Sequence, residues 1–151
     1  MPSNRVVRVR SVEDGVAAVE LREGIAGIQA ELAVTPDFPP EVERAAAAAA
    51  RAPRLPDLDR TDLSFLTIDP PGSLDLDQAV HIERDGDGYV VHYAIADVAA
   101  FVTPGDPVDV EANKRGETLY GADSKIPLHP KVLSEDAASL LPEQVRPALL
   151  W

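Results

Sequence analysis

The chain has 151 residues, a formal net charge of −12 at pH 7 and no cysteine. Without cysteine, neither disulfide bonds nor thiolate metal sites can form. The acidic balance argues against a nucleic-acid ligand for the chain taken alone, because phosphate contacts dominate nucleic-acid affinity, although carboxylates that hold metal ions invert the local field.

The first sixty residues are expected to form a small α/β extension. Residues 5–10 alternate polar and apolar, and residues 16–21 follow an Asp-Gly turn, so a hairpin of two short strands is predicted. Residues 22–38 contain Gly24 and Gly27, which argue against a long helix. The N-terminus lacks the apolar core of a signal peptide, and no apolar run reaches bilayer-spanning length, so we expect a cytoplasmic protein with no membrane partner.

A helix is predicted over residues 40–52. Two prolines suit its first turn, two glutamates there complement the helix dipole, and six consecutive alanines follow. Residues 53–62 are rich in proline and charge, which is typical of a linker. We therefore expect an N-terminal extension over residues 1–60 and a second unit over residues 61–151.

Alternating apolar residues and turn signals predict an antiparallel sheet in the second unit, with short helices beside it. Asp109 is expected to cap a helix that runs to about Gly116. The fold class is therefore α+β, with a mixed or antiparallel sheet and flanking helices. The predicted strands are residues 65–68, 79–83, 89–95, 118–120 and 148–151, and a short helical turn is expected within residues 133–141.

The segment TIDPPGSLDLDQA, residues 67–79, places three carboxylates within nine residues. Its Pro-Pro-Gly-Ser stretch favours a turn, so Asp69 is expected to fold back toward Asp75 and Asp77. Carboxylates this close repel one another unless they are protonated or neutralised by a cation, and hard ions such as Mg²⁺ prefer oxygen ligands. The spacing alone leaves two interpretations open, a magnesium site and a solvated acidic loop.

Four blocks follow one another from residue 67 to residue 149: TIDPPGSLDLDQAV, VHYAIADVAAFVTPG, EANKRGETLY and IPLHPKVLSEDAASLLPEQVRPAL. In this order they resemble the N-terminal part of the catalytic (RNB) domain of the ribonuclease II and ribonuclease R family. That family's patterns are T-I-D-x5-D-x-D-D-A, H-I-A-D-V-x-x-[FY]-V, R-G-x-[ST]-x-Y and I-P-M-L-P-x-x-L-S. The resemblance covers residues from about 61 to 151, and it implies a partial RNB domain from a bacterial branch without evident cold-shock domains.

The resemblance implies a 3′→5′ exoribonuclease that hydrolyses single-stranded RNA to nucleoside 5′-monophosphates by a Mg²⁺-dependent two-metal mechanism. This chain is expected to be a fragment of that enzyme, inactive alone. By position, Asp69, Asp75 and Asp77 match the family's metal-binding aspartates, and Asp77 is the catalytic candidate. Tyr120 matches a tyrosine that stacks on a base near the 3′ end, and the alternative for Tyr120 is a core residue.

Three further residues have open interpretations. Gln78 stands where the family pattern commonly has a fourth aspartate, and it offers only a neutral carbonyl oxygen. Arg115 is either a phosphate contact or a solvated helix end, and Asp97 either orients the site or bonds loop amides. For the whole protein, a non-catalytic RNA-binding or scaffold member of the same fold is the alternative, and an acidic calcium-binding or interaction module is a third hypothesis.

Overall fold

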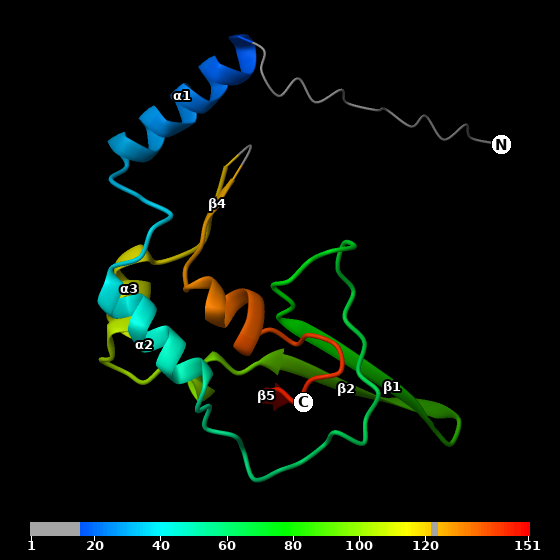
Figure 1. Ribbon diagram of the computed structural model, residues 1–151. Helices are drawn as coiled ribbons and strands as arrows, with labels where there is room; N and C mark the ends of the chain where they lie inside the picture. Colours follow the sequence, from blue (N-terminus) through cyan, green and yellow to red (C-terminus); the bar gives the residue numbers. More distant parts are fainter. Residues whose placement is uncertain (1–15, 122–123) are drawn as a thin grey trace, which may run out of the picture.

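The computed structural model describes residues 16–121 and 124–151. An antiparallel three-stranded sheet, in the order β1-β2-β5, lies beside a group of helices, as Figure 1 shows. The α+β class with an antiparallel sheet and flanking helices is confirmed. In chain order the elements are α1 (Val16–Glu31), α2 (Pro40–Ala50), β1 (Gln78–Asp85), β2 (Gly88–Ala96), the 3-10 helix η1 (Val98–Ala100), α3 (Pro107–Arg115), β3 (Leu119–Tyr120), β4 (Lys125–Ile126), the π-helical turn η2 (Leu133–Ala137) and β5 (Ala148–Leu150).

Helix α1 replaces the strand that was predicted over residues 16–21, so that prediction was wrong, and so was the argument against a helix in 22–38. Apolar side chains recur at helical spacing at Leu21, Ile25 and Ile28, and this period prevails over the Asp-Gly turn signal on which the strand was predicted. Each glycine costs only about 1 kcal/mol relative to alanine, which the surrounding helix formers outweigh. The predicted strand at residues 5–10 lies outside the described residues.

Helix α2 packs against the main hydrophobic core and contributes buried side chains to it. It begins at Pro40 with two glutamates in its first turn, as predicted, and ends two residues earlier than expected, at Ala50. Its buried Val42 and Ala46 lie one helical turn apart and belong to a cluster of buried residues with α3 and η2. Small alanine side chains let neighbouring elements approach closely. The other buried members of this cluster are Ala100, Phe101, Val108, Leu133, Ala137 and Ala138.

Strands β1 and β2 form the predicted hairpin, with Gln78 opposite Ile95 and Asp85 opposite Gly88. The first loop residue, Gly86, has φ +57°, and a tight two-residue turn with positive φ at this position favours glycine. Strand β5 then pairs with the far end of β2 in antiparallel register. The hairpin therefore holds the start of β1 and the end of β2 next to each other. Residues 67–79, which we call the acidic segment, lead into the sheet at that point.

Two local predictions need correction. The segment over residues 65–68 is not a strand, because it contributes only a single bridge in which Leu66 and Val80 exchange two hydrogen bonds of 2.9 Å. Helix α3 is capped by Asp106, whose Oδ1 accepts a 2.9 Å hydrogen bond from the amide of Asp109, so Asp109 lies within the first turn instead of at the cap. None of the helices within the described residues has both the length and the apolar character that a membrane span requires.

Candidate functional site

The acidic segment is clamped on both sides of one buried residue, Leu76. The Leu76 amide donates to Ser139 Oγ at 2.9 Å, and Ser139 Oγ donates to the carbonyl oxygen of Leu74 at 2.6 Å. The Leu140 amide donates to the carbonyl oxygen of Leu76 at 2.8 Å. Because side chains alternate along extended backbone, burying Leu76 leaves the carboxylates on either side of it exposed.

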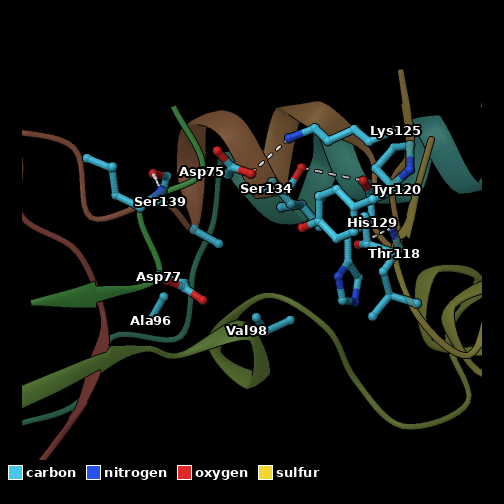
Figure 2. A pocket seen from close by; sticks show the side chains of 15 residues that line it. Asp75, Asp77, Ala96, Val98, Thr118, Tyr120, Lys125, His129, Ser134 and Ser139 are labelled. Atoms are coloured by element: carbon cyan, nitrogen blue, oxygen red, sulfur yellow. Dashed lines mark hydrogen bonds and ion pairs between the residues drawn. The ribbon is translucent and has the colours of Figure 1, made fainter. Parts of the chain in front are cut away.

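Those two carboxylates, Asp75 and Asp77, line one cavity of about 220 Å³ together with Tyr120. In the view of Figure 2, the aspartates lie on one side of the cavity and Tyr120 on the other. Tyr120 is the second residue of strand β3, and its side chain is not a core side chain, since the residue is 77% exposed. The cavity thus combines acidic oxygens and an exposed aromatic ring. From the sequence, these groups were expected at one site only because of the family resemblance.

Asp75 is engaged by a lysine that the sequence did not single out. Lys125 Nζ lies 2.8 Å from Asp75 Oδ2 and 3.3 Å from Glu135 Oε1, as the dashed line to Asp75 in Figure 2 marks. The hydrogen bond from Lys125 holds the pKa of Asp75 below its usual value, and the same bond raises the pKa of Lys125. Asp75 is therefore a carboxylate with a fixed partner in the protein.

Asp69 and Gln78 lie at a second cavity, of about 330 Å³, which Asp77 also lines. The Oε1 atom of Gln78 accepts a hydrogen bond from the hydroxyl of Tyr93. That bond uses one of the two lone pairs of the oxygen through which a glutamine would ligate a metal. Asp77 is thus the aspartate common to both cavities.

The structure does not gather Asp69, Asp75 and Asp77 into one cluster. Within residues 16–121 and 124–151, no group of three or more histidine or acidic side chains is close enough to hold a metal ion. Asp75 and Asp77 nevertheless line the same cavity, and Mg²⁺ in proteins commonly takes only one or two carboxylates, with water and substrate phosphate as its other ligands. The donor chemistry of this pair fits a magnesium ion, whereas the predicted three-aspartate set is not assembled.

Arg115 is held inside the protein, which neither of its two interpretations anticipated. Its Nε donates to Glu111 Oε1 at 2.9 Å, and its guanidinium carbon lies 3.7 Å from the centre of the Phe38 ring. Further bonds reach the carbonyl oxygens of Thr35, at 3.0 Å, and Pro127, at 3.1 Å, and the carbonyl of Asp37. With its side chain only 9% exposed, Arg115 supports the fold instead of facing a phosphate or solvent.

Asp97 follows β2 and stands before η1, at the strand end where it was expected. Its amide donates to the carbonyl oxygen of Pro147 at 3.1 Å, which joins β2 to the segment before β5, and its side chain makes no capping bond to η1. His92 bonds Glu83 across the hairpin at 3.0 Å, and its ring lies 5.9 Å from that of His81. These contacts are outside both cavities.

Sequence reasoning missed Lys125, Ser139 and Tyr93. None of the three lies in the acidic segment, and no spacing rule links them to it. Ser139, for example, is 63 residues from the amide that it bonds. His129 also lines the first cavity, and it did carry a signal: the chain has I-P-L-H-P where the family pattern has I-P-M-L-P.

Comparison with known proteins identifies relatives for most of the chain. A family model described as the RNB domain matches residues 58–151. Exoribonuclease 2 of Serratia proteamaculans is 43% identical over 96 residues, which make up 63% of this chain and 15% of that protein. Ribonuclease R of Mycoplasma genitalium is 39% identical over 89 residues, which make up 58% of this chain and 12% of that protein.

The fold has solved relatives as well. Mycoplasma genitalium RNase R in complex with ribose methylated single-stranded RNA is similar with a TM-score of 0.74 and 29% identity, covering 88% of this chain and 21% of that chain. The same protein in complex with double-stranded RNA has the same TM-score and identity, over 88% of this chain and 24% of that chain. The chain thus spans 12–15% of the length of these curated relatives.

Proposed function

Because this chain belongs to the RNB domain family, we propose that the protein is an exoribonuclease that degrades single-stranded RNA from the 3′ end, in the cytoplasm and with Mg²⁺. The products would be nucleoside 5′-monophosphates. One observation carries the proposal: Asp75 and Asp77 line the same cavity as the exposed Tyr120. An acidic pair and an aromatic platform are the two features that phosphodiester hydrolysis and sequence-independent RNA binding require. The proposed domain organisation is an extension over residues 1–60 followed by an RNB unit.

In this proposal Tyr120 binds the substrate by stacking on a base. Stacking tolerates any base, since every base has a π-face, and is worth about 1–3 kcal/mol. It positions the nucleotide so that its phosphodiester comes to the acidic side of the cavity. The acidic net charge of the chain would otherwise repel RNA, so the phosphate approaches only where cations compensate the carboxylates.

Asp77 and Asp75 are the proposed oxygen donors at the first cavity, and Asp69 is proposed as a donor at the second cavity, which Asp77 also lines. Asp77 is the most important of the three because it lines both cavities. Magnesium bound at these oxygens would supply the positive charge that the phosphodiester needs in the reaction. The protein holds Asp77 in place through the backbone, since the amide of Ala96 donates to the Asp77 carbonyl oxygen at 2.9 Å. Lys125 neutralises Asp75 and thereby lowers the repulsion between the two neighbouring carboxylates.

A second candidate function is RNA binding without catalysis. Two observations favour it: Gln78 replaces an aspartate and has its oxygen occupied by Tyr93, and Asp75 is already paired with Lys125. Both reduce the negative charge available to a divalent ion. The two functions differ in one measurable respect, which is whether bound RNA is shortened.

The test uses the protein in the full length that its gene encodes and a 3′-labelled or 5′-labelled single-stranded RNA with Mg²⁺. We expect stepwise shortening from the 3′ end, and a loss of at least about 100-fold in Asp77→Asn with RNA binding retained. Asp87→Asn is the matched control, because Asp87 is exposed in the hairpin loop, away from both cavities. Equal rates for Asp77→Asn and the wild type would remove Asp77 from the mechanism, and wild-type binding without shortening would favour the second candidate.

Gln78→Asp addresses the departure from the family pattern. The substitution adds one carboxylate at the second cavity and gives up the bond to Tyr93. We expect RNA shortening to be unchanged or faster in this variant. A large loss of activity would show that the amide of Gln78 has a specific role.

A further inference from the structure

His129 presents an unused imidazole to the cavity that Asp77 and Tyr120 line. The residue is partly buried, and neither ring nitrogen has a hydrogen-bond partner among the described residues. Among the described residues, every fully buried side-chain nitrogen or oxygen atom has a hydrogen-bond partner. The ring nitrogens of His129 are therefore not sealed in the core, and the residue lines the cavity. Figure 2 places His129 on the same side of the cavity as Tyr120, opposite the aspartates.

The other hydrogen-bonding side chains on this side of the cavity are already engaged. Lys125 is paired with two carboxylates, Thr118 Oγ1 accepts from the Leu128 amide at 3.1 Å, and Ser134 Oγ lies 3.5 Å from two backbone carbonyl oxygens. Ser139 is used to clamp the acidic segment. Apart from the aspartates and the hydroxyl donors of Tyr120 and Thr118, His129 is thus the polar group that the described cavity leaves for a ligand.

The imidazole has a defined chemistry at this position. Burial lowers the pKa of His129 below its usual value of 6.5, so the ring is neutral at pH 7. A neutral imidazole has one N–H donor and one acceptor nitrogen. The family pattern quoted above has an apolar leucine here, so the polar group is particular to this chain. It therefore adds a hydrogen-bonding capacity that the pattern itself does not contain.

We propose that His129 hydrogen-bonds the ribose 2′-hydroxyl of the nucleotide whose base stacks on Tyr120, and so strengthens the choice of RNA over DNA. The proposal rests on the proposed function. A hydroxyl is both a donor and an acceptor, as the ring is, and the 2′-hydroxyl is present on every RNA nucleotide. Base edges differ from one nucleotide to the next, so a contact compatible with degradation of any sequence is made to the sugar or the phosphate. A phosphate oxygen only accepts hydrogen bonds, whereas the 2′-hydroxyl both donates and accepts, as the ring does. The cavity, at about 220 Å³, is smaller than a drug-sized site, so a ligand would enter it with only a part of its structure.

The experiment compares the full-length protein with His129→Leu and His129→Gln on an RNA oligonucleotide and on versions with one 2′-deoxy nucleotide at each position near the 3′ end. We expect the wild type to favour ribose at one position, measured as the ratio of kcat/KM. In His129→Leu this ratio should fall about 2- to 12-fold at that position only, the size of one hydrogen bond. Glutamine keeps a donor and an acceptor, so His129→Gln should retain part of the preference.

Anisotropy measurements in EDTA, where no turnover occurs, give the corresponding ratio of Kd values for the ribose and deoxyribose oligonucleotides. His92→Leu is the matched control, because His92 bonds Glu83 away from the cavity, and it should leave the ratio unchanged. Leucine is the residue of the family pattern at position 129, so the His129→Leu variant is expected to fold, which thermal melting checks.

Each result decides between the two proposals. An unchanged ribose preference in His129→Leu, or an equal loss on ribose and deoxyribose substrates, overturns the role of His129 and leaves the proposed function standing. Wild-type protein that cleaves both sugars equally also overturns it. Wild-type protein that neither binds nor shortens RNA overturns the proposed function, and the role of His129 with it.

Discussion

Replacing Arg115 with methionine should destabilise the protein strongly, because the arginine joins three parts of the chain. Its guanidinium bonds Glu111 on its own helix, the carbonyl oxygen of Pro127, and two carbonyl oxygens in the segment between α1 and α2. The Arg115 and Glu111 side chains are only 9% and 11% exposed. The pair is thus largely withdrawn from solvent, where the loss of one partner is expensive.

The size of the effect follows from what the substitution leaves behind. In Arg115→Met, Glu111 keeps only Lys114, 3.6 Å away and itself 76% exposed, so its carboxylate stays desolvated with a weak partner. Breaking a buried ion pair on one side costs about 3–5 kcal/mol. For a chain of this size that loss corresponds to a fall of about 6–20 °C in Tm.

Urea denaturation of the 151-residue chain measures this change directly. Arg44→Met on the exposed side of α2 is the matched control and should cost less than about 0.5 kcal/mol. Adding Glu111→Gln to Arg115→Met should recover part of the loss, since it removes the stranded charge. A loss below about 1 kcal/mol for Arg115→Met, or no recovery in the double variant, would refute the buried-pair argument.

Three further outcomes follow from the site and its surroundings. Tyr120→Ala should weaken single-stranded RNA binding by about 1–3 kcal/mol in anisotropy titrations, while Tyr120→Phe should not, because the ring provides the stacking; equal weakening by both would contradict this. Lys125→Met should lower the free energy of unfolding at pH 7 by only about 0.2–1 kcal/mol, since the pair with Asp75 is partly exposed. The pKa of Asp75 is lowered in the folded state, so the stabilisation by the ion pair is present above pH 3.8 and is lost as the pH falls through the lowered pKa. A difference in the free energy of unfolding between variant and wild type that persists in more acidic solution would contradict this. Asp106→Ala removes the cap of α3 and a 2.7 Å bond from the Thr103 amide, and should cost about 0.5–2 kcal/mol by urea denaturation, with no measurable cost arguing against the cap.

Elements with strong local signals were predicted well. The hairpin of β1 and β2 follows from alternating apolar residues around a glycine-containing turn, and α2 follows from its prolines, glutamates and alanines. Helix α1 was not predicted because the Asp-Gly pair before residue 16 indicated a hairpin turn and the two glycines argued against a helix, although apolar residues recur at the helical period over the longer stretch. The cap of α3 was placed three residues late, since Asp106 and Asp109 are both good capping residues and only backbone geometry distinguishes them.

The sequence by itself determined the family resemblance, the antiparallel hairpin and the acidic segment with Asp75 and Asp77, because these depend on neighbouring residues. Only the tertiary structure decided the partners of those residues. Lys125 reaches Asp75 across 50 positions of the chain, and Arg115 reaches the carbonyl oxygen of Thr35 across 80. Such contacts depend on how the elements pack, and local spacing carries no information about them. The same limit applies to the three aspartates, which are near in sequence, whereas in the structure Asp75 lines one cavity, Asp69 lines the other and Asp77 lines both.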